Sequence, residues 1–312
     1  MSKRPKITVR AMQPSDRAEV AELICVSTNY WFQMNGNPAV FPDGPNSTSI
    51  YFDVYETLDA GENLVAVNED NGCLAGSVFL HPRETHISLG IMNVHPNYFG
   101  CGVASSMLRE ATKRADEAGK PMRLVSSGRN TDSFSLYNRV GFVPRVLFQG
   151  MWLTVPETGL DATADGQEFV REATLDDVDA MVAVEFEVAG IKRPNDIRYF
   201  IENVHECWHV SVYEDAAGAI QGFAVSCEHP GCRMVGPCAS RTEAQAAALM
   251  LTELQLRKGL TMAYMLPVAC EELVKTSYSW GAKNYEVALG QVRGEYQPMN
   301  GVSVPTFLPE TG

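Results

Sequence analysis

The sequence contains no cysteine pair at a spacing typical of metal sites or disulfide frameworks. Its 8 cysteines are scattered, and none forms a Cys-x-x-Cys pair. Disulfide frameworks are typical of small secreted domains, and this chain has 312 residues. We therefore expect reduced thiols and no metal site.

Apolar runs of membrane-spanning length are also missing. The first ten residues, MSKRPKITVR, lack the apolar core of a signal peptide. Both absences predict a soluble, cytoplasmic protein.

Positive charge is scarce, because 25 Lys and Arg residues face 38 Asp and Glu residues, giving a formal net charge of −13. Nucleic acids and anionic membranes select basic surfaces, so we expect neither as a partner. A cationic substrate such as an amine is compatible with this charge. The length, with 45% hydrophobic residues, suits two domains with cores of their own. The oligomeric state stays open.

One stretch combines a strand, a glycine turn and a helix. Residues 87–94 are mostly apolar, and Gly100-Cys101-Gly102 follows as the turn. From Val103 to Ala118 apolar residues recur every three or four positions, which predicts a helix that Gly119 ends. The free N–H groups and the dipole at such a helix start favour a phosphate.

A Gly-x-Gly turn alone is a weak signal, but two motifs here resemble those of the GNAT acetyltransferases. The first is Val94-x-Pro96 followed by Asn97-x-x-Gly100-x-Gly102-x-Ala104. The second is Asn130-x-x-Ser133-x-x-Leu136-Tyr137-x-x-x-Gly141-Phe142. In that family the first motif cradles the pyrophosphate of acetyl-CoA, and the second carries a tyrosine near the thioester sulfur. Asn97 departs from the family, which usually has Gln or Arg there.

The resemblance implies an acetyl-CoA site in the first half of the chain. Its cofactor-binding residues would be Asn93, Val94, Asn97, Phe99, Gly100, Cys101, Gly102, Val103, Ala104, Asn130, Ser133 and Tyr137. Backbone N–H groups near Asn93 and Val94 would meet the oxyanion, and Asn130 would contact the pantetheine arm. Tyr137 would give a proton to the departing thiolate, since a phenol has a higher pKa than a thiol. The alternative is that Tyr137 only packs.

The residue that accepts the amine proton is harder to identify. The strand between His86 and His95 carries no acid. His86 has a suitable ordinary pKa, and Glu84 lies just before the strand. We keep both as candidate catalytic residues beside Tyr137.

The expected fold is α/β with a mixed sheet, and the order β-α-α-β-β-β-α-β-α-β in the first half matches the GNAT topology. Residues 156–167 are polar and turn-rich, and residues 168–312 contain faint echoes of the first half. We therefore predict a GNAT domain at 1–155, a linker at 156–167 and a second GNAT-like domain at 168–312, each a mixed β-sheet with helices on both faces.

The second copy lacks the glycine turn. Ser240 and Glu243 form a predicted capping box, which would close the helix that follows. We expect this domain to be degenerate for cofactor binding.

Two further segments give structural predictions. Residues 28–48 contain Tyr30, Trp31 and Phe32 among glycines and prolines, which favours a long loop. That loop would be either a pocket wall or an aromatic plug on the core. His81 is expected to be a structural residue in a turn.

The resulting function is an N-acetyltransferase that acts by direct attack of an amine, on a small molecule or a peptide, on acetyl-CoA. The alternative is a tandem GNAT module that binds or senses acyl-CoA without turnover. A third interpretation is an aminoacyl-transferase that uses charged tRNA. The acidic charge and the retained glycine turn argue against it.

Overall fold

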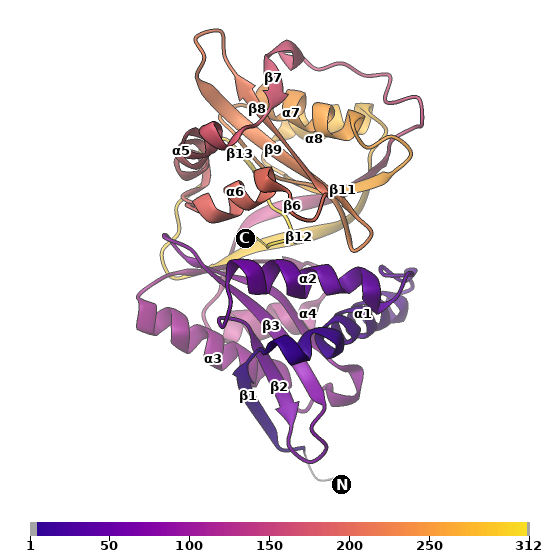
Figure 1. The fold of residues 1–312 in the computed structure, drawn as a ribbon, viewed down its shortest axis with the longest axis vertical. Coiled ribbons are helices and arrows are strands. Elements are labelled where there is room, and N and C mark those ends of the chain that lie inside the picture. Colours follow the sequence, from indigo (N-terminus) through magenta and orange to yellow (C-terminus); the bar gives the residue numbers. More distant parts are fainter. Residues whose placement is uncertain (1–4, 311–312) are drawn as a thin grey trace. The chain divides into compact units, whose positions relative to one another are not determined.

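A computed structural model describes residues 5–310 of the chain. These residues form two compact units. The first contains residues 5–82, 87–122 and Phe307–Glu310, and the second contains Arg83–His86 and Arg123–Thr306. Figure 1 shows the helices and strands of both units.

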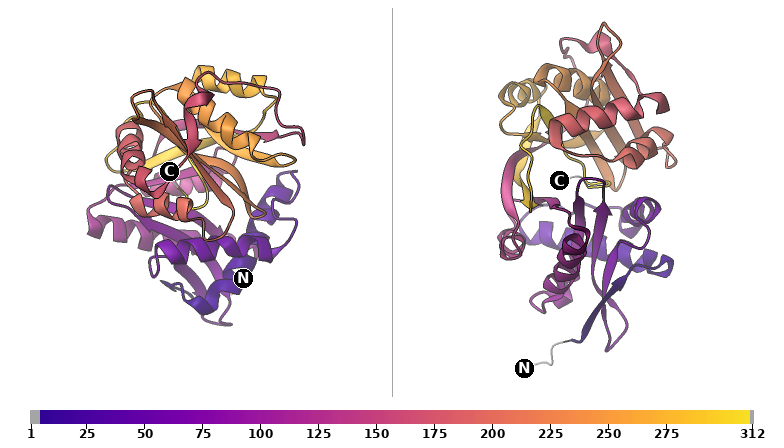
Figure 2. Two further views of the ribbon diagram at one scale, coloured as in Figure 1. Left: turned by 45° about the horizontal axis from the view of Figure 1, so that its top comes forward. Right: turned by 90° about the vertical axis from the view of Figure 1, so that its left-hand side faces the viewer.

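The first unit is built on an antiparallel sheet with the strand order β1-β2-β3-β4. Helices α1 and α2 cover one face of this sheet and α3 covers the other (Figure 2). A side chain at Gly76 of β3 would collide with Val103 and Met107 of α3, so glycine allows the close approach. The elements are β1 (Ile7–Ala11), η1 (Pro14–Asp16), α1 (Arg17–Met34), α2 (Pro45–Leu58), β2 (Leu64–Asn68), β3 (Leu74–Pro82), β4 (Ile87–Val94), η2 (Pro96–Tyr98) and α3 (Val103–Ala118).

The second unit contains a longer sheet with the strand order β5-β12-β6-β11-β10-β9-β8-β7, and β13 pairs with β10. Its core surrounds α7, in which every residue from Ala246 to Leu251 is buried. The elements are β5 (Met122–Ser127), α4 (Thr131–Arg139), β6 (Val143–Thr154), η3 (Gln167–Phe169), β7 (Val170–Glu172), η4 (Leu175–Asp177), α5 (Val178–Ala189), α6 (Pro194–Glu202), β8 (Trp208–Glu214), β9 (Ile220–His229), β10 (Cys232–Ser240), α7 (Glu243–Gln255), β11 (Thr261–Pro267), α8 (Glu271–Ser279), β12 (Lys283–Arg293) and β13 (Val302–Val304).

The element order of the first half repeats in the second half. From β1 to β6 the chain follows β-α-α-β-β-β-α-β-α-β, and the same order runs from β7 to β12. The predicted α/β fold with a mixed sheet and an internal duplication is therefore confirmed. Residues 156–166, between the two copies, contain neither helix nor strand.

The last strands of the two copies are exchanged within the second unit. β6, from the first copy, lies between β11 and β12, and it is antiparallel to both. β12, from the second copy, lies between β5 and β6. Sequence order alone does not reveal this exchange, and the compact units divide the chain elsewhere than at the predicted linker. The domain boundaries at 155 and 168 stay a prediction.

The prediction of a long loop at residues 28–48 was wrong. α1 continues to Met34, so Tyr30, Trp31 and Phe32 are helical, and α2 already begins at Pro45. The irregular segment is short because the first glycine of the stretch is Gly36, and aromatic residues before it tolerate the helix. The Asn29 side chain bonds the Phe41 carbonyl and N–H at 3.0 and 2.9 Å, which holds the segment against α1.

His81 is also placed differently from the prediction. It lies in β3 rather than in a turn and is fully buried. Its Nδ1 is 2.5 Å from a carboxylate oxygen of Asp59, and its ring stacks on Tyr55 with centroids 4.3 Å apart. Its expected structural role agrees with this burial.

Tyr55 fixes the segment Phe307–Glu310 to the first unit. Its hydroxyl donates a hydrogen bond to the Phe307 carbonyl at 2.8 Å and accepts one from the Glu310 N–H at 3.0 Å. Leu308 and Glu310 are buried there. A buried hydroxyl with two backbone partners resists removal, because both partners would lose a hydrogen bond.

The described residues were compared with three possibilities: a membrane-spanning helix, a metal site and disulfide bonds. No helix within 5–310 is long and apolar enough to cross a membrane. In the same range, no three His, Cys, Asp or Glu side chains gather so as to hold a metal ion. All eight cysteines, each within the described part of the chain, carry free thiols.

We expect Tyr55→Phe to lower the free energy of unfolding by about 1–2 kcal/mol, because it leaves the Phe307 carbonyl and the Glu310 N–H without their partner. Denaturant unfolding would measure the loss. Tyr30→Phe is the control, since Tyr30 is 40% exposed. An equal effect of both substitutions would contradict this role of Tyr55.

Candidate functional site

The predicted phosphate turn lies between β4 and α3 of the first unit. Gly100 and Gly102 have φ angles of +74° and +85°, a left-handed conformation that favours glycine. A Cβ atom at either glycine would meet nothing within 4 Å. The backbone of this turn is therefore not covered by neighbouring side chains at Gly100 and Gly102.

The start of α3 is not closed by any side chain. Gly102 is the N-cap and has no side-chain oxygen to accept a hydrogen bond. Within residues 5–310, no side chain accepts from the N–H groups of Val103, Ala104 or Ser105. These donors and the helix dipole give the start of α3 a partial positive charge that suits a phosphate.

Aromatic and polar residues surround this turn. The His95 ring accepts a hydrogen bond from the Asn97 N–H at 3.2 Å, and the Asn97 side chain is exposed. Phe99 is 50% exposed and meets Tyr30 of α1 edge to face, with centroids 5.7 Å apart. Cys101 is half-buried and donates its backbone N–H to the Tyr98 carbonyl. The sequence pattern predicted Tyr30 in a loop that would be a pocket wall or an aromatic plug, whereas it lies on α1.

Two buried polar groups on the neighbouring strands lack partners. Asn93 of β4 is paired in register with Ser77 of β3. Asn93 Nδ2 and Ser77 Oγ are buried and have no hydrogen-bond partner among the described residues. Such groups are uncommon, since each costs the free energy of desolvation. Ser77 was not predicted, because a serine inside a strand has no distinguishing pattern.

The second motif lies in the second unit. Asn130 caps α4 by accepting a hydrogen bond from the Ser133 N–H at 3.0 Å. Tyr137 is buried and meets Phe142 edge to face, with centroids 5.8 Å apart. The Phe142 N–H also donates to the Tyr137 carbonyl at 3.1 Å. The fixed spacing of this motif thus has a structural cause, which leaves the catalytic role of Tyr137 a prediction.

The two candidate bases also belong to the second unit. His86 is 1% exposed, and its Nδ1 lies 3.0 Å from Thr85 Oγ1. Glu84 is largely exposed, and its carboxylate is 4.0 Å from the Lys192 ammonium. Their environments differ, because His86 is desolvated and Glu84 faces water.

The predicted residues are thus divided between the units. Residues 93–104 lie together in the first unit along one strand, turn and helix start. The second unit contains Glu84, His86, Asn130, Ser133 and Tyr137.

In the second copy, the helix that corresponds to α3 is α7, and its start is closed. The predicted capping box was displaced by two residues. The N-cap is Thr242, whose side chain accepts from the Gln245 N–H, while the Gln245 side chain accepts from the Thr242 N–H at 3.1 Å. Ser240 instead ends β10, and the Glu243 carboxylate accepts from the Leu273 N–H at 2.7 Å. Side chains thus accept from the Thr242 and Gln245 N–H groups at this helix start.

Comparison with known proteins finds a family match within the first half of the chain. Residues 28–142 match the model of the Acetyltransferase (GNAT) family. No curated protein sequence matches the chain.

Three solved structures share the fold over nearly the whole chain. A candidate acetyltransferase from Pyrococcus horikoshii has a TM-score of 0.73 at 14% identity, with 95% of this chain and 91% of that chain covered. A GCN5-related N-acetyltransferase from Sphaerobacter thermophilus has a TM-score of 0.62 at 17% identity, with 94% and 97% covered. A tandem GNAT protein from the clavulanic acid biosynthesis pathway has a TM-score of 0.61 at 12% identity, with 94% and 100% covered. At these identities the likeness concerns the fold alone.

We expect Thr242→Ala to lower the free energy of unfolding by about 1 kcal/mol, because the substitution opens the start of α7. Denaturant unfolding would measure this. Thr131→Ala is the control, because Thr131 is exposed at a helix start that Asn130 caps. Equal losses in both variants would show that the Thr242 cap contributes nothing of its own.

Proposed function

Because residues 28–142 match the acetyltransferase (GNAT) family, we propose that the protein transfers an acetyl group from acetyl-CoA to an amine. The acceptor would be a small molecule or a peptide. The open start of α3 carries this proposal, because two left-handed glycines and uncapped N–H groups suit the pyrophosphate of acetyl-CoA.

The reaction needs three proton and charge adjustments. The amine nitrogen attacks the thioester carbonyl carbon and loses a proton, the carbonyl oxygen becomes an oxyanion, and the carbon–sulfur bond breaks to release a thiolate. Donors must stabilise the oxyanion, and the thiolate must gain a proton. Asn93 supports the second requirement, because its buried Nδ2 has no partner among residues 5–310 and it lies on the strand whose backbone we assign to the oxyanion.

We assign the protonation of the thiolate to Tyr137. A phenol holds its proton at neutral pH and can donate it to a newly formed thiolate. The edge-to-face contact with Phe142 restrains the ring, which would limit the freedom of the hydroxyl.

We propose that either Glu84 or His86 is the base that removes the proton from the amine. Glu84 is exposed and would exchange its proton with solvent, which suits removal of a proton from an ammonium. His86 is buried with Thr85 as a neighbour, and a neutral imidazole could accept the proton instead.

The second copy would not bind a pyrophosphate at α7. The Thr242 side chain already accepts from the Gln245 N–H there, so a phosphate would have to displace a formed capping box. We therefore propose one acetyl-CoA per chain. Nucleic acids and membranes are not proposed as partners, and the cytoplasm stays the expected location.

The competing proposal is a module that binds acyl-CoA without turnover. The lack of an acid between Ile87 and Val94 favours it, since that strand then offers no carboxylate base. Binding of acetyl-CoA is common to both proposals, and only thiol release with an amine separates them.

Titration calorimetry with acetyl-CoA should give one saturable equivalent in the unmodified protein. Gly100→Glu should weaken binding by at least about tenfold, because a carboxylate would stand beside the pyrophosphate. Gly72→Glu is a matched control, since Gly72 has a φ of +77°, lies in the same unit and also faces open space. Equal binding by both variants, or two equivalents, would overturn the proposed site.

Release of free thiol from acetyl-CoA with a panel of amines tests turnover. Tyr137→Phe should lower kcat about a hundredfold and leave the KM for acetyl-CoA nearly unchanged, because only proton donation is lost. Tyr278→Phe should retain activity, since Tyr278 is 46% exposed and lies on α8, the helix of the second copy that corresponds to α4. Full activity of Tyr137→Phe would remove this role, and binding without thiol release from any amine would favour the non-catalytic module.

A further inference from the structure

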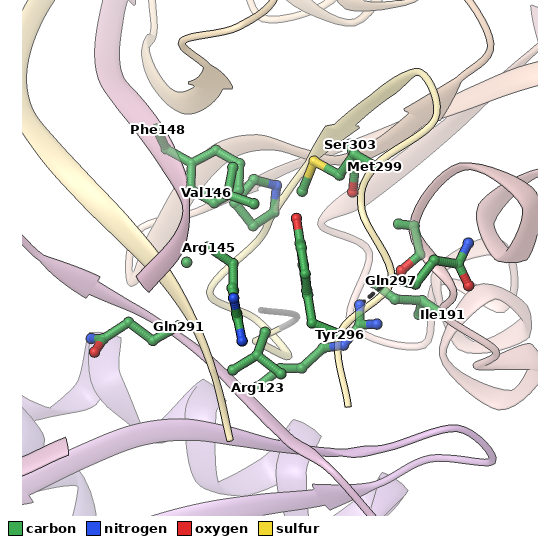
Figure 3. A pocket seen from close by; sticks show the side chains of 14 residues that line it. Arg123, Arg145, Val146, Phe148, Ile191, Gln291, Tyr296, Gln297, Met299 and Ser303 are labelled. Carbon is green, nitrogen blue, oxygen red and sulfur yellow. Dashed lines mark hydrogen bonds between the residues drawn. The ribbon is translucent and has the colours of Figure 1, made fainter. Parts of the chain in front are cut away.

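The second unit contains a pocket that the proposed reaction does not use. The enclosed room for a water-sized molecule is about 30 Å³, and the space open to solvent at the mouth adds to it. Strands β5, β6 and β12, the end of α5 and the segment after β12 contribute to it (Figure 3). Its lining includes two arginines and four largely apolar or aromatic residues, which are Arg123, Arg145, Val146, Phe148, Tyr296 and Met299.

Arg123 is the unusual residue of this pocket. It is 8% exposed and donates one hydrogen bond, from Nη1 to the Ala189 carbonyl at 2.8 Å. Nε is buried without a partner, and within residues 5–310 Nη2 has none either. Nε and Nη2 form one edge of the guanidinium, which is the edge that binds a carboxylate through two parallel hydrogen bonds.

Among residues 5–310, no carboxylate forms a hydrogen bond or an ion pair with Arg123. No acidic residue lines the pocket. The nearby Glu185 is bonded to Arg193 at 2.9 and 3.0 Å. Burial lowers the pKa of the Arg123 guanidinium, because removing the cation from water is unfavourable in free energy. A buried charge without a counterion is destabilising, and an anionic ligand would remove that cost.

A second cation lies near the first. The guanidinium carbon of Arg145 lies 5.4 Å from the centroid of the Tyr296 ring, and Arg145 is exposed. In Figure 3 the two arginines lie on either side of Tyr296. Two cations in a chain with a net charge of −13 make this pocket a local exception to the acidic character of the protein.

The other walls are mainly apolar. Val146 and Phe148 come from β6, and Ile191, Met299 and Pro305 complete the lining. An inorganic anion would leave these side chains without contacts. A ligand with a carboxylate and a short apolar body would meet both the arginine edge and the apolar walls.

We propose that this pocket binds a small monocarboxylate with a short, branched apolar chain, whose carboxylate pairs with the Nε and Nη2 edge of Arg123. The carboxylate also lies in the field of Arg145, and the apolar chain contacts Val146, Phe148 and Met299. This proposal does not depend on acetyl transfer, because every residue in it belongs to the second unit and none is assigned to the reaction.

Titration calorimetry with isovalerate at constant ionic strength tests the proposal directly. Isovalerate should bind saturably and at least about tenfold more tightly than isovaleramide, which has the same shape without the charge. It should also bind more tightly than acetate, because each added buried carbon raises affinity about fourfold. Equal binding of isovalerate and isovaleramide would overturn the proposal without any variant, and so would tighter binding of inorganic phosphate.

Arg123→Met removes the guanidinium and keeps an apolar side chain. It should abolish isovalerate binding, and it should not lower the thermal midpoint, because an unpaired buried charge is lost. Arg198→Met, at an exposed position of α6 outside the pocket, is the matched control and should bind isovalerate normally. Unchanged binding in Arg123→Met would place the ligand elsewhere and overturn the assignment.

Discussion

The antiparallel hydrogen-bond ladder between β6 and β12 joins the strands of the two copies into the sheet of the second unit. Its register runs from Lys283 opposite Trp152 to Val292 opposite Val143. These are the last strands of the two copies, so the ladder joins residues that are more than a hundred positions apart in the chain. The same strands provide Val146, Phe148 and Gln291 to the pocket around Arg123. A one-residue change of register would turn these side chains to the opposite face of the sheet.

The corresponding helices α3 and α7 differ at their N-terminal ends, which is where α3 would bind the pyrophosphate of acetyl-CoA. α3 begins after two left-handed glycines and leaves its first N–H groups to an outside partner. α7 begins with a capping box, in which the Thr242 side chain accepts from the Gln245 N–H and so already uses one of the equivalent donors. A helix start is either stabilised by its own side chains or available to an anion, because both use the same donors.

The buried arginines of the second unit make a similar contrast. Arg193 is paired with Glu185, and Arg83 lies 2.9 Å from a carboxylate oxygen of Asp196. Among residues 5–310, Arg123 has the Ala189 carbonyl as its only hydrogen-bond partner. Since desolvation is costly for any guanidinium, the two paired arginines are balanced within the fold and Arg123 is not.

The sequence by itself determined the local elements and the phosphate turn. Strand alternation, the 3.6-residue period after Val103 and the glycines at 100 and 102 are local signals, and they predicted the element order and the open start of α3. Local signals also led to two wrong predictions. The glycines and prolines after residues 30–32 favoured a loop where α1 continues, and the cap of α7 was placed two residues too early. Only the tertiary structure decided the strand exchange, the burial of His81 against Asp59 and the solitary position of Arg123. Each of these depends on residues distant in sequence, whose contacts form only when the sheets assemble.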